Sequence, residues 1–129
     1  MRPRFFELEH VQKGDVLFLS GCSQCASTGT ISIEGPLDRP LVLRKSDANS
    51  SPRPLEGDSR TAVVTGDGPI RLKAEINVDG ELKVIKSGVL IADRDGKEKG
   101  LHFAFDIEDS SDNDFNDYSV NVACWHRRG

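Results

Sequence analysis

The sequence predicts an all-β protein, an antiparallel β-sandwich of about nine strands of the Greek-key type. Three observations support this prediction. Apolar and polar residues alternate with a period of two in several segments, and helical periodicity is nearly absent. Turn residues separate these segments at the ~8–12-residue spacing typical of sandwiches. Because 129 residues is the size of one domain, we expect residues 1–129 to form a single β-sandwich domain.

The second half of the chain carries the clearest strand pattern. Residues 70–79 read IRLKAEINVD, a strict alternation that places the apolar side chains on one face of a strand. Asp79-Gly80 then predicts a hairpin to the next strand, since glycine adopts a positive φ without steric cost. The strands that follow are expected at 82–85 continuing into 89–92, at 101–105 after an Asp95-Gly96 turn, and at 118–125.

The first half repeats the pattern less regularly. Residues 46–60 are polar and contain two prolines, so we expect a long surface loop there. Short runs rich in β-branched and aromatic residues flank this loop and indicate strands. These candidates are Phe5–Leu8, Asp15–Leu19, Thr28–Ile33, Leu41–Arg44 and Thr61–Thr65.

The formal net charge of −4 comes from one segment. Residues 106–117 (DIEDSSDNDFND) contain six of the 21 acidic residues and no Lys or Arg, which leaves 15 acids against 17 bases elsewhere. A broad basic face for nucleic acid is therefore not expected. No run approaches the ~18 apolar residues of a membrane span. The N-terminus has no apolar signal region, so we expect cytoplasmic synthesis without a signal peptide, with release or surface display by a signal-independent route left open.

The acidic segment joins two predicted strands, so strand pairing crowds its carboxylates. Two like charges ~4 Å apart repel by about 4 kcal/mol near a protein surface. That is large beside the ~5–15 kcal/mol stability of a domain. No basic neighbour in the sequence relieves the repulsion, but a divalent cation would. Since carboxylate, amide and carbonyl oxygens are hard donors, the pattern favours Ca²⁺. The alternative is a solvated acidic turn that improves solubility.

The spacing within the segment indicates the kind of calcium site. Asp112-x-Asp114-x-Asn116 is similar to the first half of an EF-hand loop, but Asp117 stands where that loop needs glycine, and no helix flanks it. The site is therefore not an EF-hand. Five carboxylates within residues 108–117 exceed what one calcium ion usually needs, which favours two adjacent ions.

The segment EDSSDNDFND (108–117), followed by an alternating strand and a terminal glycine, resembles the calcium-mediated bacterial lectins that bind fucose and mannose. Those proteins carry a loop of the type E-D-G-T-D-N-D-Y-N-D before a strand and a C-terminal glycine. The order of the upstream strand candidates fits as well. The resemblance implies a lectin-like sandwich with two Ca²⁺ ions side by side, whose free coordination positions take neighbouring sugar hydroxyls.

The resemblance also implies a set of site residues. The implied calcium ligands are Glu108, Asp112, Asp114, Asn116 and Asp117, with the backbone carbonyl of Gln24 and, in a neighbouring subunit's site, the carboxylate of Gly129. The implied sugar contacts are Asp109, Ser111, Asp112, Asp114, Asn116, Asp117, Cys25, Ala26 and Ser27. Residues 24–27 replace the family's Asn-Ser-Ser-Gly-like loop, so the sugar preference stays open. A shared C-terminal ligand implies a homodimer or homotetramer.

The cysteines and aromatic residues lie outside that motif. We expect Cys22, Cys25 and Cys124 to be free thiols. The alternatives are a Cys22–Cys25 disulfide and a zinc site that these cysteines form with His126. The strand phase places Phe103, Phe105 and Tyr118 in the core and His102 on the polar face, and we expect Trp125 to pack within its sheet rather than stack on a sugar.

These observations predict a non-enzymatic, calcium-dependent carbohydrate-binding protein. A calcium-stabilised structural or adhesion module without a sugar site is the alternative, because residues 24–27 depart from the family pattern. Glycoside hydrolysis is disfavoured. It needs one carboxyl group with a raised pKa in an apolar setting, whereas these carboxylates cluster in a polar segment.

Overall fold

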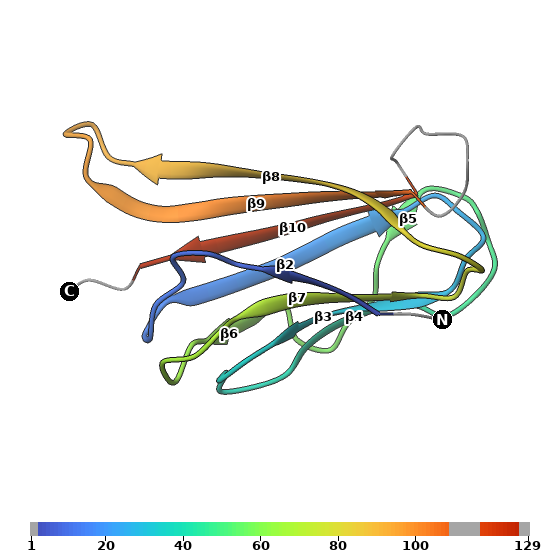
Figure 1. Ribbon diagram of the computed structural model, residues 1–129, viewed down its shortest axis with the longest axis horizontal. Coiled ribbons are helices and arrows are strands. Elements are labelled where there is room, and N and C mark those ends of the chain that lie inside the picture. The colour runs from blue at the N-terminus through green and yellow to red at the C-terminus, as the bar shows by residue number, and fades with distance from the viewer. Residues whose placement is uncertain (1–2, 109–116, 127–129) are drawn as a thin grey trace.

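The computed structural model describes residues 3–108 and 117–126, and all regular structure within them is β-strand. The strands form two antiparallel sheets that lie face to face, as Figure 1 shows. The predicted all-β sandwich is therefore confirmed. Among the described residues there is no helix long and apolar enough to cross a membrane.

The smaller sheet has four strands and the larger has six. The smaller sheet has the order β1 (Arg4–Glu7), β7 (Arg71–Ile76), β3 (Gly29–Glu34), β4 (Leu41–Lys45). The larger sheet has the order β5 (Arg53–Pro54), β2 (Val16–Ser23), β10 (Tyr118–Trp125), β9 (Glu98–Glu108), β8 (Lys83–Ala92), and β6 (Thr61–Val63) also pairs with β2.

The larger sheet has the predicted Greek-key connectivity. Strands β8, β9 and β10 follow one another as antiparallel neighbours, and β2, far earlier in the chain, completes the row beside β10. This is the arrangement of three consecutive strands with a fourth joined by a long connection. This connection places β2 next to β10, the last described strand, so residues that are distant in sequence meet at both ends of the sheet.

The core lies between the sheets and follows the alternation read from the sequence. On β7, Leu72, Ala74 and Ile76 are at most 1% exposed, and the polar residues between them face outward. The predicted core residues Phe103, Phe105 and Tyr118 are buried as well. Burial of each large apolar side chain stabilises the fold by about 1.5–3 kcal/mol. The two sheets therefore pack together through the apolar side chains whose alternation predicted the strands.

The predicted hairpin at Asp79-Gly80 is wrong, although the turn itself is present. Gly80 has φ +95°, as a tight turn requires. However, β7 already pairs with β1 on one side and β3 on the other, so neither edge is available to the next strand. The chain therefore crosses to the larger sheet, where β8 pairs with β9 instead.

The segment 46–60 is only partly the surface loop expected from its composition. Its residues Arg53 and Pro54 form β5 against the end of β2. The next residue, Leu55, is 1% exposed and donates its backbone N–H to the carbonyl of Gly21 at 2.9 Å. A single apolar residue in a polar stretch thus anchors the loop to the core.

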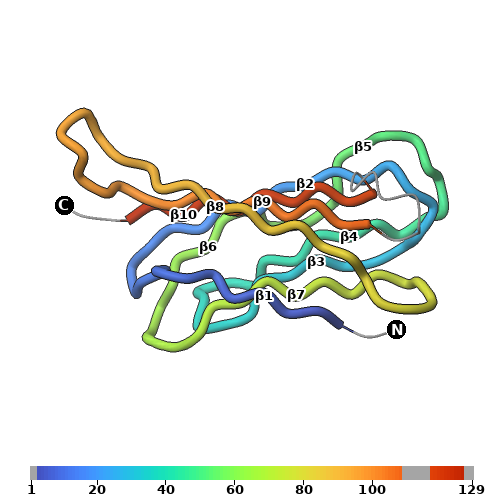
Figure 2. Tube along the Cα trace, turned by 45° about the horizontal axis from the view of Figure 1, so that its top comes forward, coloured from blue at the N-terminus to red at the C-terminus, as the bar shows by residue number. Residues whose placement is uncertain are grey.

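The hairpin of β8 and β9 projects beyond the rest of the sandwich, as Figures 1 and 2 show. The predicted Asp95-Gly96 turn closes it, with φ +80° at Gly96. Strand β8 is an edge strand, and three of its large apolar side chains are about half exposed: Ile85, Val89 and Leu90. Such an edge can pair or pack with another chain.

Trp125 is 42% exposed, so the expectation that it packs within the sheet is wrong. Cys124, Val122 and Val120 on the same strand face the core, which places Trp125 on the outward phase of β10. The opposite sheet cannot cover a side chain on that phase. His102 lies on the outward phase of β9, as predicted, and is partly buried there.

Candidate functional site

Strand register brings three of the predicted calcium ligands to one end of the larger sheet. Tyr118 lies opposite Ile107 on β9 and opposite Ser23 on β2. One residue further along, Asp117 therefore has Glu108 on one side and Gln24 on the other. The backbone N–H of Gln24 donates to the carbonyl of Asp117 at 3.0 Å, which fixes the contact between the two segments.

Glu108 and Asp117 are buried although they belong to the outward phase of their strands. Their exposed fractions are 1% and 6%. Opposed positions on neighbouring antiparallel strands are about 4.5–5.5 Å apart, and like charges there are destabilising. Lys83 follows Glu108 in the same row, on β8. This row therefore places two buried carboxylates next to each other, with a cationic residue beside Glu108.

The loop after β2 is tied to the same strand that carries Asp117. The Tyr118 hydroxyl donates to the carbonyl of Ser27 at 2.6 Å, and the Tyr118 side chain is fully buried. The Cys25 thiol lies 3.8 Å from the same carbonyl, and Cys25 is buried. Of the predicted sugar contacts on this loop, Ala26 is exposed, Ser27 is partly exposed and Cys25 points inward. Tyr118 thus sets the position of the loop.

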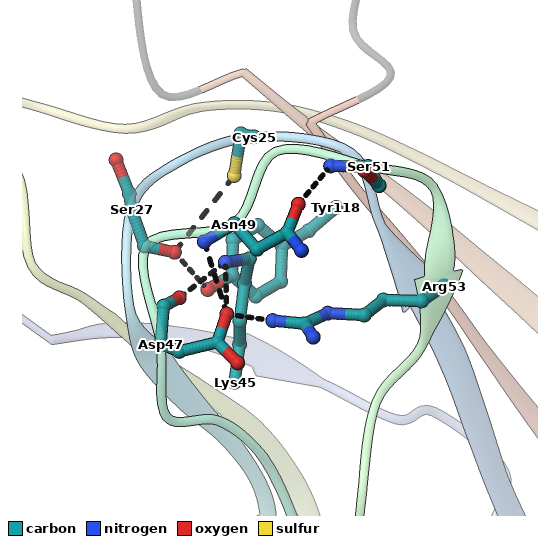
Figure 3. Close-up of polar contacts among 8 residues, drawn as sticks. All are labelled: Cys25, Ser27, Lys45, Asp47, Asn49, Ser51, Arg53 and Tyr118. Carbon is teal, nitrogen blue, oxygen red and sulfur yellow. Dashed lines mark hydrogen bonds and ion pairs between the residues drawn. The ribbon is translucent and has the colours of Figure 1, made fainter.

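A second loop, formed by residues 46–52, lies beside residues 25–27, a neighbour that was not predicted. Figure 3 shows Asp47 close to Ser27 and Tyr118. The nearly buried Lys45 ammonium group donates to the Asp47 carbonyl at 2.5 Å, and the Arg53 guanidinium pairs with the Asp47 carboxylate. The carboxylate also accepts the N–H of Asn49 at 3.0 Å. These contacts hold the loop in one conformation at the edge of the site.

The sequence contains a local signal for the order of this loop. The Asn49 side chain accepts the Ser51 N–H at 2.9 Å, two residues on, just as Asp47 accepts the N–H of Asn49. An Asp-x-Asn-x-Ser spacing favours this succession of side-chain-to-backbone turns. The pattern predicts an ordered loop, but not its neighbour, which follows from the β3–β4 register, where Gly29 pairs with Lys45.

The remaining predicted site residues lie outside the described residues. For the acidic segment these are Asp109, Ser111, Asp112, Asp114 and Asn116, and at the C-terminus Gly129. Within the described residues, Glu108, Asp117, Gln24 and the 25–27 loop come together at one end of the sheet.

The alternative of a zinc site formed by all three cysteines and His126 is wrong. Cys124 pairs with Leu17, which lies five residues from Cys22 along β2, about 16 Å at the rise of an extended strand. The CxxC pair and the Cys124–His126 pair are therefore at opposite ends of the sheet. All three cysteines are free thiols in the structure, so the Cys22–Cys25 disulfide is not formed.

The architecture is that of bacterial lectins of known structure. The C-terminal domain of the BC2L-C lectin from Burkholderia cenocepacia superposes with a TM-score of 0.63 at 18% identity, covering 98% of each chain. Lectin CV2L from Chromobacterium violaceum, solved with alpha-methyl-fucoside, has the same score and identity over 99% of this chain and 100% of its own. The high-affinity mannose-binding lectin of Ralstonia solanacearum also gives 0.63 and 18%, over 96% of each chain.

The resemblance stated from the acidic motif is thus confirmed at the level of the fold, across nearly the whole chain. No family model matches the sequence, and no curated protein matches it. A shared fold does not fix function, which depends on the chemistry of the site.

Proposed function

We propose that this protein is a calcium-dependent lectin that binds fucose- or mannose-type monosaccharides. The observation that carries the proposal is the buried pair Glu108 and Asp117, held against Gln24 at one end of a sandwich with a bacterial lectin fold. Three lectins share that fold, one solved with a fucoside and one described as mannose-binding.

The described residues fit a calcium site. Glu108 and Asp117 supply hard carboxylate oxygens, and Gln24 adds a backbone carbonyl in the same row. A divalent cation bound between two adjacent carboxylates would offset their mutual repulsion, which supports the proposed metal. With Asp112, Asp114 and Asn116, this set would hold two Ca²⁺ ions. When bound, the ions would supply coordination positions for two neighbouring sugar hydroxyls.

The protein's own residues would position the sugar. The Tyr118 hydroxyl holds the Ser27 carbonyl, so the 25–27 loop stays close to the start of β10. Asp109, Ser111, Asp112, Asp114, Asn116 and Asp117 would accept or donate hydrogen bonds to sugar hydroxyls. We infer a binding protein rather than an enzyme, because carboxylates that ligate metal remain ionised and cannot act as the general acid of glycoside hydrolysis.

We further propose a homodimer or homotetramer. The half-exposed apolar residues Ile85, Val89 and Leu90 on the edge strand β8 support self-association. In the proposed assembly, the carboxylate of Gly129 would complete a neighbour's calcium site. Light scattering coupled to size exclusion tests this proposal, and a monomer at all concentrations would contradict it.

Isothermal titration with methyl fucoside and methyl mannoside tests the proposed function directly. We expect binding heat in calcium, none in EDTA, and recovery after calcium is restored. Absence of calcium-dependent heat with both sugars and with a wider monosaccharide panel would contradict the proposal.

One observation favours a second candidate, a calcium-stabilised module without a sugar site. Cys25 is buried and the Ser27 carbonyl is engaged by Tyr118, so the 25–27 loop presents few side chains to a ligand. This candidate predicts a calcium-induced rise in Tm, since a ligand at 100 times its Kd stabilises by about 2.7 kcal/mol. It also predicts no heat with any sugar, and this second result distinguishes it from the lectin.

A further inference from the structure

A cluster of buried metal-ligating side chains lies at the other end of the larger sheet. Asp15 immediately precedes β2 and His126 immediately follows β10. Val16 pairs with Trp125, so the next residues outward, Asp15 and His126, lie in one row. Cys124 points inward beneath them and is fully buried. The Greek-key connection therefore brings the side-chain carboxylate of Asp15, near the start of the chain, to the thiol of Cys124 and the imidazole of His126, near its end.

The side chains of this cluster converge on the Asp15 carboxylate. The Cys124 thiol donates to Asp15 Oδ2 at 3.2 Å, and His126 Nδ1 lies 3.0 Å from both carboxylate oxygens. The Asp15 and His126 side chains are only 4% and 1% exposed. One ligand atom from each of the three residues lies within 4.8 Å of the others. Burial therefore excludes bulk water from three groups that all bind metal.

The second ring nitrogen of His126 has its own partner. His126 Nε2 lies 2.5 Å from Glu98 Oε2, at the start of β9. Metal-bound histidines commonly donate the ring N–H that faces away from the metal to a carboxylate, which orients the ring. With Nε2–H directed at Glu98, Nδ1 is the ring nitrogen that faces Asp15, and it becomes a metal ligand once it gives up the proton that it shares with the carboxylate. The Glu98 side chain is 37% exposed, so the cluster lies one residue beneath the surface.

We propose that Asp15, Cys124 and His126 form a binding site for a divalent transition metal of the zinc class, with Glu98 as the positioning residue of the His126 ring. Tetrahedral zinc with sulfur, nitrogen and oxygen ligands separates neighbouring ligand atoms by about 3.2–3.6 Å. The Asp15–His126 and Asp15–Cys124 separations of 3.0 and 3.2 Å need only a small expansion, and all three ligand atoms lie within 4.8 Å of one another. Binding would release two protons to solvent, the thiol proton of Cys124 and the Nδ1 proton of His126, because the thiolate and the unprotonated ring nitrogen are the ligands.

The chemistry of the donors separates this site from the acidic segment. Thiolate and imidazole favour zinc and similar metals, whereas calcium favours oxygen ligands. Calcium is therefore not expected to compete here. A nucleophilic role for Cys124 does not fit, since burial and the hydrogen bond to Asp15 raise the pKa of the thiol and keep it protonated in the absence of metal.

Cobalt titration of the reduced, calcium-saturated full chain tests the proposal. We expect one Co²⁺ per chain, with the visible bands of tetrahedral coordination and a thiolate-to-cobalt charge-transfer band, both removed by excess Zn²⁺. Cys124→Ser should lose the charge-transfer band, whereas the matched control Cys22→Ser should keep it, because Cys22 is exposed at the opposite end of β2. Glu98→Gln should weaken Zn²⁺ binding about tenfold or more.

Two results would overturn the proposal. One is a wild-type protein without a thiolate-to-cobalt band, which would leave the cluster as a metal-free hydrogen-bond network. The other is an unchanged band in Cys124→Ser. Circular dichroism checks that each variant folds. If Cys124→Ser does not fold, His126→Gln replaces it, and an unchanged cobalt spectrum in that variant would equally refute the ligand set.

Discussion

The backbone N–H of Gln24 donates to the carbonyl of Asp117 at 3.0 Å. This hydrogen bond extends the pairing of β2 with β10 by one residue beyond Ser23 and Tyr118. It joins the loop that follows an early strand to the end of the acidic segment. The proposed calcium and sugar residues therefore depend on a contact between distant parts of the chain.

Replacing Glu108 or Asp117 should abolish the stabilisation of the fold by calcium. In Glu108→Gln or Asp117→Asn, the loss of one negative charge relieves the repulsion between opposed carboxylates, so the metal-free Tm should not fall. Calcium affinity should fall at least tenfold, and the calcium-induced rise in Tm should disappear. Calorimetry with and without EDTA measures both effects. Asp95→Asn, at the opposite end of the β8–β9 hairpin, is the control and should keep the full calcium response.

Tyr118→Phe should weaken both the fold and the binding of sugar. The substitution removes the hydroxyl that donates to the Ser27 carbonyl at 2.6 Å. Leaving that carbonyl without this donor should reduce the free energy of unfolding by about 1–2 kcal/mol. Urea denaturation measures the loss, and titration with methyl fucoside measures the effect of a less constrained 25–27 loop. Ser20→Ala, exposed on β2, is the control. Unaltered sugar affinity in Tyr118→Phe would exclude a positioning role for the hydroxyl.

Gly100→Ala should be strongly destabilising. A Cβ at Gly100 would lie 2.2 Å from the Cys124 carbonyl oxygen, so the backbones of β9 and β10 would have to separate. We expect a loss of about 2–3 kcal/mol. Gly88→Ala is a matched control on β8, where the added Cβ would meet its nearest neighbour at 3.7 Å. That variant should be neutral or up to about 1 kcal/mol more stable. Equal stability of the two variants would refute this account of the close approach.

The pKa of Asp93 should be depressed, which makes the stability of the β8–β9 turn depend on pH. Its carboxylate accepts the backbone N–H groups of Lys97 and Asp95, both at 2.9 Å, and these hydrogen bonds lower the pKa of Asp93 below its usual value. The folded-state pKa lies below the unfolded value of ~3.9, so this stabilisation is present above pH ~3.9. It is lost as the pH falls through the folded pKa. A titration followed by carboxyl chemical shift measures the pKa, and a value at or above ~3.9 would contradict the assignment.

Much of the fold could be predicted from the sequence because a half-buried strand records its two faces in alternate residues. The alternation at 70–79 correctly predicted the buried face of β7, and the pattern at 118–125 predicted the bounds of β10. The Asp95-Gly96 turn was predictable for a similar local reason, since glycine relieves the steric cost of positive φ. These features depend only on neighbours along the chain.

Other features depended on which strand edges were already occupied. Asp79-Gly80 signalled a turn, but β7 had partners on both sides, so the turn leads to the other sheet. Leu55 looked like part of a polar loop and is a buried anchor. The phase of β10 exposes Trp125, although its size suggested packing. The first two outcomes are not encoded in local spacing, whereas the exposure of Trp125 follows from the alternation at 118–125.

The sequence by itself determined the all-β class, the alternating core and the acidic segment with its hard oxygen donors, because side-chain period and ligand chemistry are local properties. Only the tertiary structure decided that Gln24 lies beside Asp117 and that Asp15 lies beside His126. Both neighbours arise from the antiparallel register of β2 and β10, which a Greek-key connection brings together. Such register is set by how two sheets bury their apolar faces against each other, a property of the whole domain.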